Sequence, residues 1–252
     1  MKKIVLTLAL FVTLAISAEQ SSMSESDRKM YEEMLENNPA DMFVSEGEEE
    51  FEENLGGEEA LAKFLEVPED KLAKYIAGFP RYIKKMGNVV GLDQVLQVMQ
   101  VQQEKPKESL DSEKMYSLVS YVKSLANDEN VSIDVSSSKE MKESYVLGKK
   151  LYEVARGGRG LACIGCHRTS GALLRTQILP HLGEIGTGAT WPAYRMTQST
   201  VVSMQKRFQG CMTDSLQAPL PLGSKEMVAL EIYITNLAKE QHKVMAIPGL
   251  KR

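Results

Sequence analysis

The pentapeptide CIGCH, Cys163 to His167, decides the fold class of this chain. Cysteines three residues apart lie on one face of a helical turn, so both sulfurs can bond to the two vinyl groups of one porphyrin. The adjacent histidine can then bind the iron as its proximal ligand. Cys-x-x-Cys-His is the attachment motif of c-type haem. The sequence therefore predicts one covalently bound haem c.

Two other chemistries use a Cys-x-x-Cys pair, namely a redox dithiol and half of a zinc site. The chain has three cysteines, so no second cysteine cluster can complete a zinc site. No strand–helix–strand pattern typical of thioredoxin surrounds the motif. The third cysteine, Cys211, has no disulfide partner once the other two hold haem. An unpaired thiol in an oxidising compartment needs a function or deep burial.

The N-terminal segment 1–18 has the features of a secretory signal peptide. Two lysines form a charged n-region, and the apolar run from Ile4 to Ile16 is too short to span a bilayer. With cleavage after Ala18, we expect a periplasmic protein without a membrane anchor; a retained anchor is the alternative. Cleavage removes both lysines and changes the net charge from −4 to −6. This charge gives no indication of nucleic-acid binding.

The chain contains an internal repeat that spans most of its length. Three pairs of segments match without gaps at a shift of 112 residues: FPRY and WPAY (79–82, 191–194), GNVVGLDQVLQVMQ and STVVSMQKRFQGCM (87–100, 199–212), KMYSLVSYVKSLA and EMVALEIYITNLA (114–126, 226–238). Upstream, GEEEFEEN (47–54) resembles GKKLYEVA (148–155) at a shift of 101. The first copy therefore lacks eleven residues where the second carries CIGCH.

This repeat predicts a mainly α-helical chain of two tandem cytochrome c-like domains, the first lacking haem. Each copy is expected to have an opening helix, a Pro-containing segment and two closing helices. Apolar residues recur at three- and four-residue steps in the last helix of each copy: Met115, Leu118, Val119, Val122 and Leu125, then Met227, Leu230, Ile234 and Leu237. We expect Ser224 to start the final helix and Asp111 to start its counterpart.

The predicted divisions of the chain follow from this repeat. They are the signal peptide 1–18, an N-terminal arm 19–46 with one helix around Asp27 to Leu35, a haemless domain 47–126, a polar linker 127–138 and a haem-binding domain 139–252.

A haem iron held by CIGCH needs a second axial ligand. Methionine is common in small cytochromes, and the candidates are Met204, Met212 and Met227. Cys211 is as good a candidate as its neighbour Met212 by spacing alone. A thiolate ligand favours ferric iron and lowers the potential, which suits sulfur chemistry better than simple electron transfer. The remaining histidines, His181 and His242, are interpreted as ordinary polar residues.

Arg207 lies four residues before Cys211, so a helix would place both on one face. The matching positions in the first copy are Val95 and Met99, so the pair is specific to the haem-bearing copy. A guanidinium suits an anion with several oxygens. Pairing with a haem propionate is the alternative role for Arg207, and the sequence does not separate the two.

The stretch from Thr190 to Glu240, with the ending AIPGLKR, resembles the C-terminal domain of the SoxA family, the cytochrome subunits of SoxAX thiosulfate-oxidising complexes. The matching elements are WPAYR, an arginine four residues before GCM, the GS–x3–VALE–x–Y helix and the closing Pro-Gly-x-x-Arg. The early NPA, GEEEFEEN and FPRY segments resemble the first domain of that family. The resemblance thus covers most of the chain after the signal peptide.

This resemblance implies an activity and a set of site residues. The family oxidatively couples thiosulfate to a cysteine of the SoxYZ carrier, an L-cysteine S-thiosulfotransferase activity, and electrons leave through the haem of SoxX. Cys163 and Cys166 would hold the haem, with His167 as its proximal ligand. Cys211 would be the distal ligand and, as a cysteine persulfide, the catalytic sulfur. Arg207 would bind the substrate anion.

The chain departs from the family pattern in two respects. Many members carry a second haem in the first domain, whereas this chain resembles the single-haem subtype. The family often has an arginine shortly after GCM, where this chain has Leu216 and Gln217. That anion contact would then be missing, or supplied by Lys206, Arg195 or the partner subunit.

Two other functions are compatible with the haem motif. One is a periplasmic electron-transfer cytochrome with Met212 on the iron, and the other is a thiosulfate dehydrogenase that forms tetrathionate. Coupling thiosulfate to a thiol releases two electrons, whereas one haem accepts one. The coupling function therefore predicts a partner that carries a second redox centre.

Overall fold

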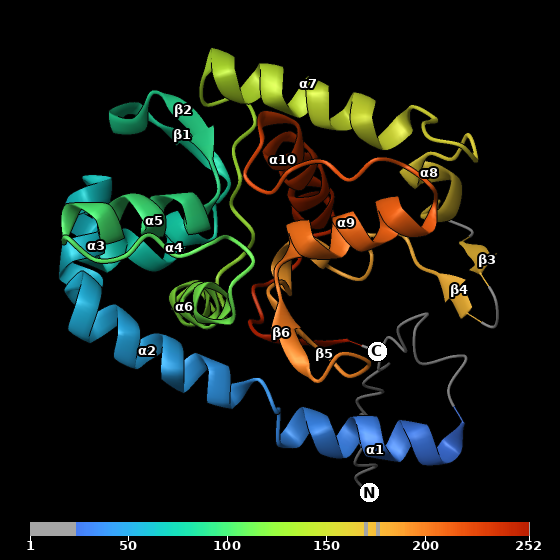
Figure 1. Ribbon diagram of the computed structural model, residues 1–252, viewed down its shortest axis with the longest axis horizontal. Helices are drawn as coiled ribbons and strands as arrows, with labels where there is room; N and C mark the ends of the chain where they lie inside the picture. The colour runs from blue at the N-terminus through green and yellow to red at the C-terminus, as the bar shows by residue number, and fades with distance from the viewer. Residues whose placement is uncertain (1–23, 169–170, 175–176, 252) are drawn as a thin grey trace, which may run out of the picture.

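The computed structural model describes residues 24–168, 171–174 and 177–251, and it consists of two helical halves that lie side by side (Figure 1). The predicted signal peptide lies outside these residues. The helices are α1 (Glu25–Glu36), α2 (Asp41–Leu55), α3 (Gly57–Leu65), α4 (Leu72–Ile76), α5 (Leu92–Gln102) and α6 (Glu113–Ser124), then α7 (Lys139–Glu153), α8 (Cys163–Cys166), α9 (Met204–Asp214) and α10 (Lys225–Glu240). Among the described residues, no helix combines the length and apolar character needed to cross a lipid bilayer.

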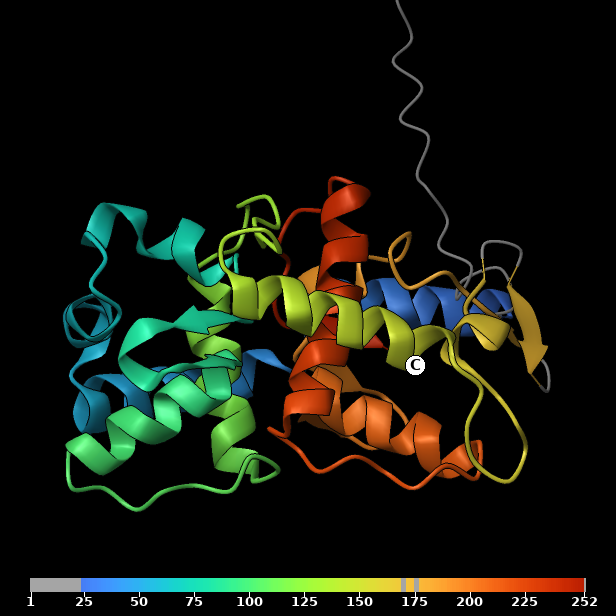
Figure 2. The same ribbon diagram turned by 90° about the horizontal axis from the view of Figure 1, so that it is seen from above.

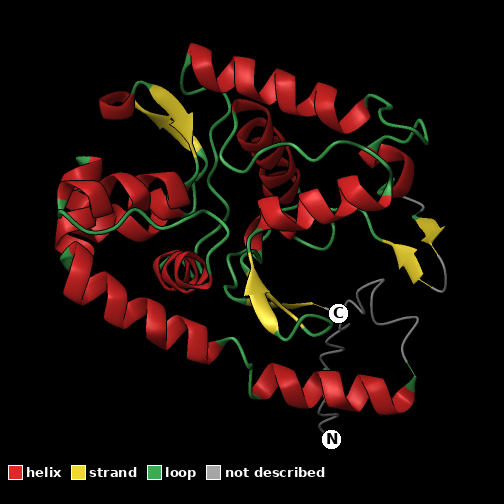
Figure 3. Ribbon diagram, viewed as in Figure 1, coloured by secondary structure: helices red, strands yellow, loops and turns green. Residues whose placement is uncertain are grey.

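Short strands accompany the helices (Figure 3). They are β1 (Arg81–Ile83), β2 (Asn88–Val90), β3 (Ala172–Leu174), β4 (Gln177–Leu179), β5 (Ala193–Arg195), β6 (Thr200–Val202) and β7 (Gly249–Lys251). The pairs β1–β2, β3–β4 and β5–β6 are antiparallel, and β7 joins β5 in parallel. The prediction of a mainly helical chain is confirmed, and these hairpins were not predicted.

The internal repeat is visible as repeated structure. The elements β1, β2, α5 and α6 each begin 112 residues before β5, β6, α9 and α10. Both Phe79-Pro80 and Trp191-Pro192 are cis peptide bonds at the same shift. The two hairpins have matching register, with Tyr82 opposite Val89 and Tyr194 opposite Val201. The prediction of two tandem cytochrome c-like domains is confirmed.

Each copy is built around a close crossing of its opening and closing helices. Helix α2 packs on α6, and α7 packs on α10, as Figure 2 shows for the second pair. A methyl group on Gly47 would collide with the carbonyl oxygen of Ser117, and one on Gly148 with that of Ala229. The two contacts are equivalent in the repeat, because Gly148 lies 101 residues after Gly47 and Ala229 lies 112 residues after Ser117. Glycine at both crossings lets the helix backbones touch.

The closing helices begin at serine caps. The Ser224 hydroxyl accepts a hydrogen bond from the Met227 N–H at 3.2 Å, as predicted for α10. In the first copy the prediction of Asp111 is wrong, because the Ser112 hydroxyl accepts from the Met115 N–H at 3.1 Å. Asp111 stands one residue too early to reach that N–H group and lies outside the helix.

The N-terminal arm reaches across to the second half. Helix α1 matches the helix expected around Asp27 to Leu35, and the Tyr31 hydroxyl donates to the Leu250 carbonyl at 3.1 Å. The Asn38 amide donates to the Pro248 carbonyl at 3.0 Å. Helix α2 begins at Asp41, inside the segment predicted as the arm. The segment 127–138, predicted as polar, buries Val131 and Ile133 in the core.

The interior of the first copy is filled by apolar side chains, and this core continues into the second half of the chain through Met141, Val228 and Ile232. Helices α3 and α4 stand where the second copy has the haem motif, and they contribute six residues to this core: Leu61, Ala62, Phe64, Leu65, Leu72 and Ile76. Val95 and Met99, the counterparts of Arg207 and Cys211, are buried in the same core. The first copy is therefore densely packed, and it shares its apolar core with the second half of the chain.

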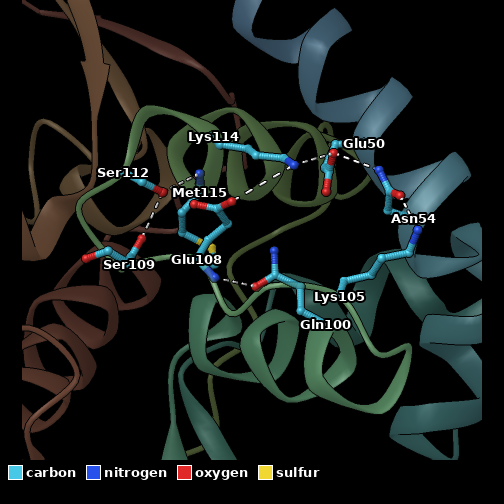
Figure 4. Close-up of polar contacts among 9 residues, drawn as sticks. All are labelled: Glu50, Asn54, Gln100, Lys105, Glu108, Ser109, Ser112, Lys114 and Met115. Carbon is cyan, nitrogen blue, oxygen red and sulfur yellow. Dashed lines mark hydrogen bonds and ion pairs between the residues drawn. The ribbon is translucent and has the colours of Figure 1, made fainter.

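Polar contacts hold the segment between α5 and α6 against α2 (Figure 4). The Lys114 ammonium lies 2.9 Å from the Glu50 carboxylate, and the Glu108 N–H donates to the Gln100 side-chain oxygen at 3.1 Å. The Lys105 ammonium donates to the Asn54 amide oxygen at 2.6 Å. These contacts fix the start of α6, which faces the second copy.

A buried polar cluster joins the two copies. The Lys123 ammonium on α6 lies 3.7 Å from the Glu231 carboxylate on α10, and both side chains are about 9% exposed. The other oxygen of Glu231 accepts from the Gln205 amide on α9 at 2.7 Å. Burial and the nearby Glu231 charge raise the pKa of Asp93, at the start of α5, to about 7. The haemless copy thus contacts the helix that bears Arg207 and Cys211.

Candidate functional site

The haem motif forms the single turn of α8. The His167 N–H donates to the Cys163 carbonyl at 2.9 Å, which closes the turn and places Cys163 and Cys166 on one face. The His167 Nδ1 lies 2.8 Å from the Pro180 carbonyl oxygen, which can only accept, so Nδ1 carries the proton. This leaves the lone pair of a neutral imidazole on Nε2, the atom suited to bind a metal.

Tyr152 fixes the backbone at the same point. Its hydroxyl donates to the His167 carbonyl at 3.1 Å from the last turn of α7. Burial, followed by the Cys163 charge, raises the pKa of Tyr152, so the hydroxyl stays protonated as a donor. Pro180 and Tyr152 therefore hold the histidine from two sides. Neither contact could be found from a sequence motif.

Helix α9 supplies the other predicted residues. The Ser203 hydroxyl accepts from the Lys206 N–H at 3.1 Å and caps the helix start. Arg207 and Cys211 follow one turn apart, and both line a cavity of about 770 Å³ that also contacts Cys163, Cys166 and His167. All five predicted site residues therefore meet in one cavity. Its apolar wall is formed by Leu161, Leu179, Leu182, Phe208, Leu230 and Ile234.

The thiols in this cavity are affected by burial and by arginine. Burial raises the pKa of Cys211, and the positive charges of Arg207 and Arg195 oppose that rise. Burial raises the pKa of Cys163 to about 11. The thiols of Cys163 and Cys211 are therefore neutral until a reaction or a metal removes the proton, and metal binding does so because the ligand is the thiolate.

These residues fit a c-type haem. Two thiols lie one turn apart for the vinyl groups, and an imidazole is held in the tautomer that a metal needs. The cavity is within the range of cofactor pockets, roughly 300–1,000 Å³, and combines apolar walls with a few polar groups. Cys211 brings a further sulfur atom, of the kind that soft metal ions prefer, into the same cavity from α9.

The rival axial ligands have other surroundings. Met212 also contacts the cavity, but its sulfur accepts a hydrogen bond from the Leu220 N–H at 3.5 Å. Met204 lies at the boundary with the first copy, where it lines a small cavity with Leu92 and Glu231. Met227 is fully buried in the core. His242 is exposed beyond α10, as expected for an ordinary polar residue.

The structure separates the cations considered near the site. Lys206 pairs with Asp111 at 3.4 Å and does not contact the cavity. Arg195, on β5, lines the cavity. Arg159 also lines the cavity and donates a hydrogen bond to the Asp214 carbonyl at 3.1 Å. Arg159 was not predicted from the sequence, because it lies in a Gly-rich loop without a recognisable motif.

The residues that follow GCM pack the end of α9 against the loop before the haem motif. The Gln217 amide donates to the Leu161 carbonyl at 3.1 Å, which ties the end of α9 to the segment before the haem motif. Leu216 is 59% exposed. Neither Leu216 nor Gln217 supplies a cation after GCM, whereas Arg195 and Arg159 line the cavity together with Arg207.

Comparisons with known proteins agree with this geometry. The family model described as SoxA/TsdA, cytochrome c domain, matches residues 46–131 and 147–242. The L-cysteine S-thiosulfotransferase subunit SoxA of Hydrogenophilus thermoluteolus is 29% identical over 276 aligned positions, covering 100% of both chains. A thiosulfate dehydrogenase of Thiomonas intermedia is 37% identical over 84 residues, covering 32% of this chain and 25% of the dehydrogenase. A crystal structure of SoxXA from P. pantotrophus has the same fold, with a TM-score of 0.69 at 22% identity, covering 85% of this chain and 79% of that chain.

Proposed function

Because the chain belongs to the SoxA/TsdA cytochrome c domain family, we propose that it is the haem-containing SoxA subunit of an L-cysteine S-thiosulfotransferase. It oxidatively couples thiosulfate to a cysteine of the SoxYZ carrier. The observation that carries this proposal is the position of Arg207 and Cys211, one turn apart in the same cavity as the haem motif. The full-length match to a SoxA subunit supports it.

One haem c would be held covalently by Cys163 and Cys166, and His167 and Cys211 are the residues that would bind its iron. The hydrogen bond from His167 Nδ1 to Pro180 supports the proximal role, because it orients Nε2 as the binding atom. The bond from the Leu220 N–H to the Met212 sulfur favours Cys211 over Met212. When bound, the haem supplies one-electron redox chemistry.

The net reaction joins two sulfur atoms. An S–S bond forms between the outer sulfur of thiosulfate and the carrier cysteine, the thiol S–H bond breaks, and one proton and two electrons are released. Arg207 donates hydrogen bonds to the oxygens of the thiosulfate dianion and orients its outer sulfur toward Cys211. Arg195 and Arg159 add positive charge to the cavity. Cys211, as a persulfide, is the catalytic sulfur.

The assembly follows from the electron count. Two electrons leave and one haem accepts one, so the chain works with the cytochrome SoxX, in a heterodimer or a larger complex. The segment 1–18 directs export to the periplasm, where the haem is attached. The division into a haemless domain 47–126, a linker 127–138 and a haem-binding domain 139–252 belongs to the same proposal, with the first domain in a structural or partner-binding role.

The decisive experiment measures haem reduction by thiosulfate. The protein is assembled with its cytochrome partner and tested with the carrier, with a carrier whose cysteine is replaced, and without carrier. We expect reduction only when the carrier cysteine is present, together with a mass increase of the carrier. Reduction without carrier, with tetrathionate as the product, would instead identify a thiosulfate dehydrogenase. If thiosulfate does not reduce the haem under any of these conditions, the protein would be an electron-transfer cytochrome.

A further inference from the structure

Asp214 is an acidic residue to which the proposed reaction assigns no role. It is the last residue of α9 and lies one turn after Cys211, which itself lies one turn after Arg207. Spacings of three and four residues place these side chains on one face of the helix. Asp214 lines the cavity that contains the haem motif, and among the described residues of that lining it is the one carboxylate.

The position of Asp214 is unfavourable for the stability of α9. The C-terminal end of a helix carries partial negative charge, which repels a carboxylate. The last turn has no lysine or arginine that would compensate, and no cation among the described residues forms an ion pair with Asp214. Arg159 bonds the backbone carbonyl of Asp214 rather than its carboxylate. A local rule that is broken beside a cavity is typical of a functional residue.

The carboxylate of Asp214 lies near the sulfur of Cys211. Burial raises the pKa of Cys211, Arg207 opposes that rise, and the negative charge of Asp214 adds to it. Such an influence requires a short separation between the two groups. In the proposed reaction the outer sulfur of thiosulfate meets the carrier cysteine beside Cys211, and the carrier thiol gives up its proton there. A proton acceptor at this place would raise the rate of coupling.

The other groups that share the cavity are poor proton acceptors. The charged or titratable ones among the described residues are Arg159 before α8, Cys163, Cys166 and His167 on and after α8, Arg195 on β5, and Arg207 and Cys211 on α9. The arginines stay protonated, and the thiols of the haem motif are used for attachment. The histidine already carries its proton on Nδ1 and directs Nε2 to the metal. Helix α10 contributes only apolar side chains to the lining.

We propose that Asp214 accepts the proton of the carrier cysteine during coupling. As the S–S bond to the outer sulfur of thiosulfate forms, the S–H bond breaks and its proton moves to a carboxylate oxygen of Asp214, from which water removes it. The two electrons leave as in the proposed function, and Asp214 takes none. The inference rests on that function. Asp214 touches the reacting thiol in this scheme and is therefore a catalytic residue.

The test measures the rate of coupling in the assembled complex with its cytochrome partner and the carrier. Asp214→Asn keeps the shape of the side chain and removes the base, so kcat at pH 7 should fall by roughly 100-fold or more. KM for thiosulfate should stay the same or fall, because a negative charge has left an anion-binding cavity. The rate of this variant should recover as the pH approaches about 8.5, where a cysteine thiol ionises by itself.

Glu184→Gln is the matched control, since Glu184 is an exposed acid of the same copy that does not line the cavity. It should leave kcat unchanged, and Asp214→Glu should retain more activity than Asp214→Asn. A kcat close to that of the wild type in Asp214→Asn, an equal loss in Glu184→Gln, a loss that persists at high pH, or a matching rise in KM for thiosulfate would each overturn the inference.

Covalent haem and the ferric spectrum are measured first in every variant, so that a loss of haem is not mistaken for a loss of the base. If Asp214→Asn loses haem, Asp214→Ser carries the test with the same expected recovery at high pH. Absence of coupling in the wild-type complex would instead refute the proposed function, and the role of Asp214 would fall with it.

Discussion

Cys211 and Met212 are neighbours on α9 with different surroundings. Both contact the cavity, yet the Met212 sulfur accepts a backbone hydrogen bond and the Cys211 thiol lies beside Arg207 and Arg195. We expect Cys211→Ala to abolish thiosulfate coupling while Cys163 and Cys166 keep the haem attached. Met212→Leu should retain the haem spectrum and most of the activity. Coupling that survives in Cys211→Ala, measured by carrier mass, would exclude the catalytic role.

Arg207 and Lys206 are adjacent cations that differ in what they contact. Arg207 faces the cavity, whereas Lys206 is paired with Asp111 outside it. Arg207→Gln should raise KM for thiosulfate by roughly 10- to 100-fold, because hydrogen bonds to a charged group are worth roughly 1.5–3 kcal/mol. Lys206→Gln, which removes the same charge one residue away, should leave KM nearly unchanged. Equal effects in steady-state kinetics would mean that only the net charge matters.

The reactive side chains of the site could be predicted from residue type, whereas the backbone groups that hold them could not. CIGCH, Arg207 and Cys211 could be selected because few residue types bind haem or sulfur anions. The Pro180 carbonyl that orients His167 is a backbone atom, and any residue could supply it.

At the scale of the elements, Gly148 decides how closely α7 approaches α10. A methyl group there would collide with the Ala229 carbonyl oxygen, so the helices would have to separate. Gly148→Ala should destabilise the fold by about 1–3 kcal/mol, the usual range for overpacking. Gly210→Ala is the control on α9, because its methyl group would meet only the Arg207 side chain at 3.5 Å. That variant should be neutral or slightly stabilising in urea unfolding, as alanine is preferred over glycine within helices.

Helices were predicted better than strands because periodicity needs length to show. α6 and α10 contain several turns of apolar residues at helical spacing, and both were found. Each strand has three residues, too few for an alternating pattern to stand out. The ungapped repeat nevertheless implied that whatever FPRY forms, WPAY also forms, and both segments enter equivalent hairpins. The repeat therefore predicted the equivalence of the hairpins without predicting their conformation.

At the scale of the whole molecule, the buried cluster between the copies makes stability depend on pH. Burial and the Glu231 charge raise the pKa of Asp93 to about 7, while Lys123 and the Gln94 N–H act in the opposite direction. The folded protein therefore binds the Asp93 proton more tightly than the unfolded chain. The stability contributed by this proton is complete below the ordinary carboxyl pKa, about 4, and is lost as the pH rises through 7.

Urea unfolding across this pH window tests the cluster. The wild-type protein should lose stability as the pH rises, and Asp93→Asn should flatten that dependence. Asp134→Asn is the control and should leave the dependence in this window unchanged, because hydrogen bonds from Ser136 lower the pKa of Asp134 and its contribution is lost only as the pH falls below about 4. A pH dependence unchanged in Asp93→Asn would show that another group is responsible.

The filled interior of the first copy limits how electrons can travel. A cytochrome with a haem in each half can accept electrons at one haem and release them from the other. Here Leu61, Phe64 and Leu72 fill the core of the first copy, so the described residues of that copy offer no second site for electron transfer. Electrons would then enter and leave through the same haem site in the second copy. If the second half holds the one haem, we expect the cytochrome partner and the carrier to dock at the same end of the molecule, either side by side or in turn.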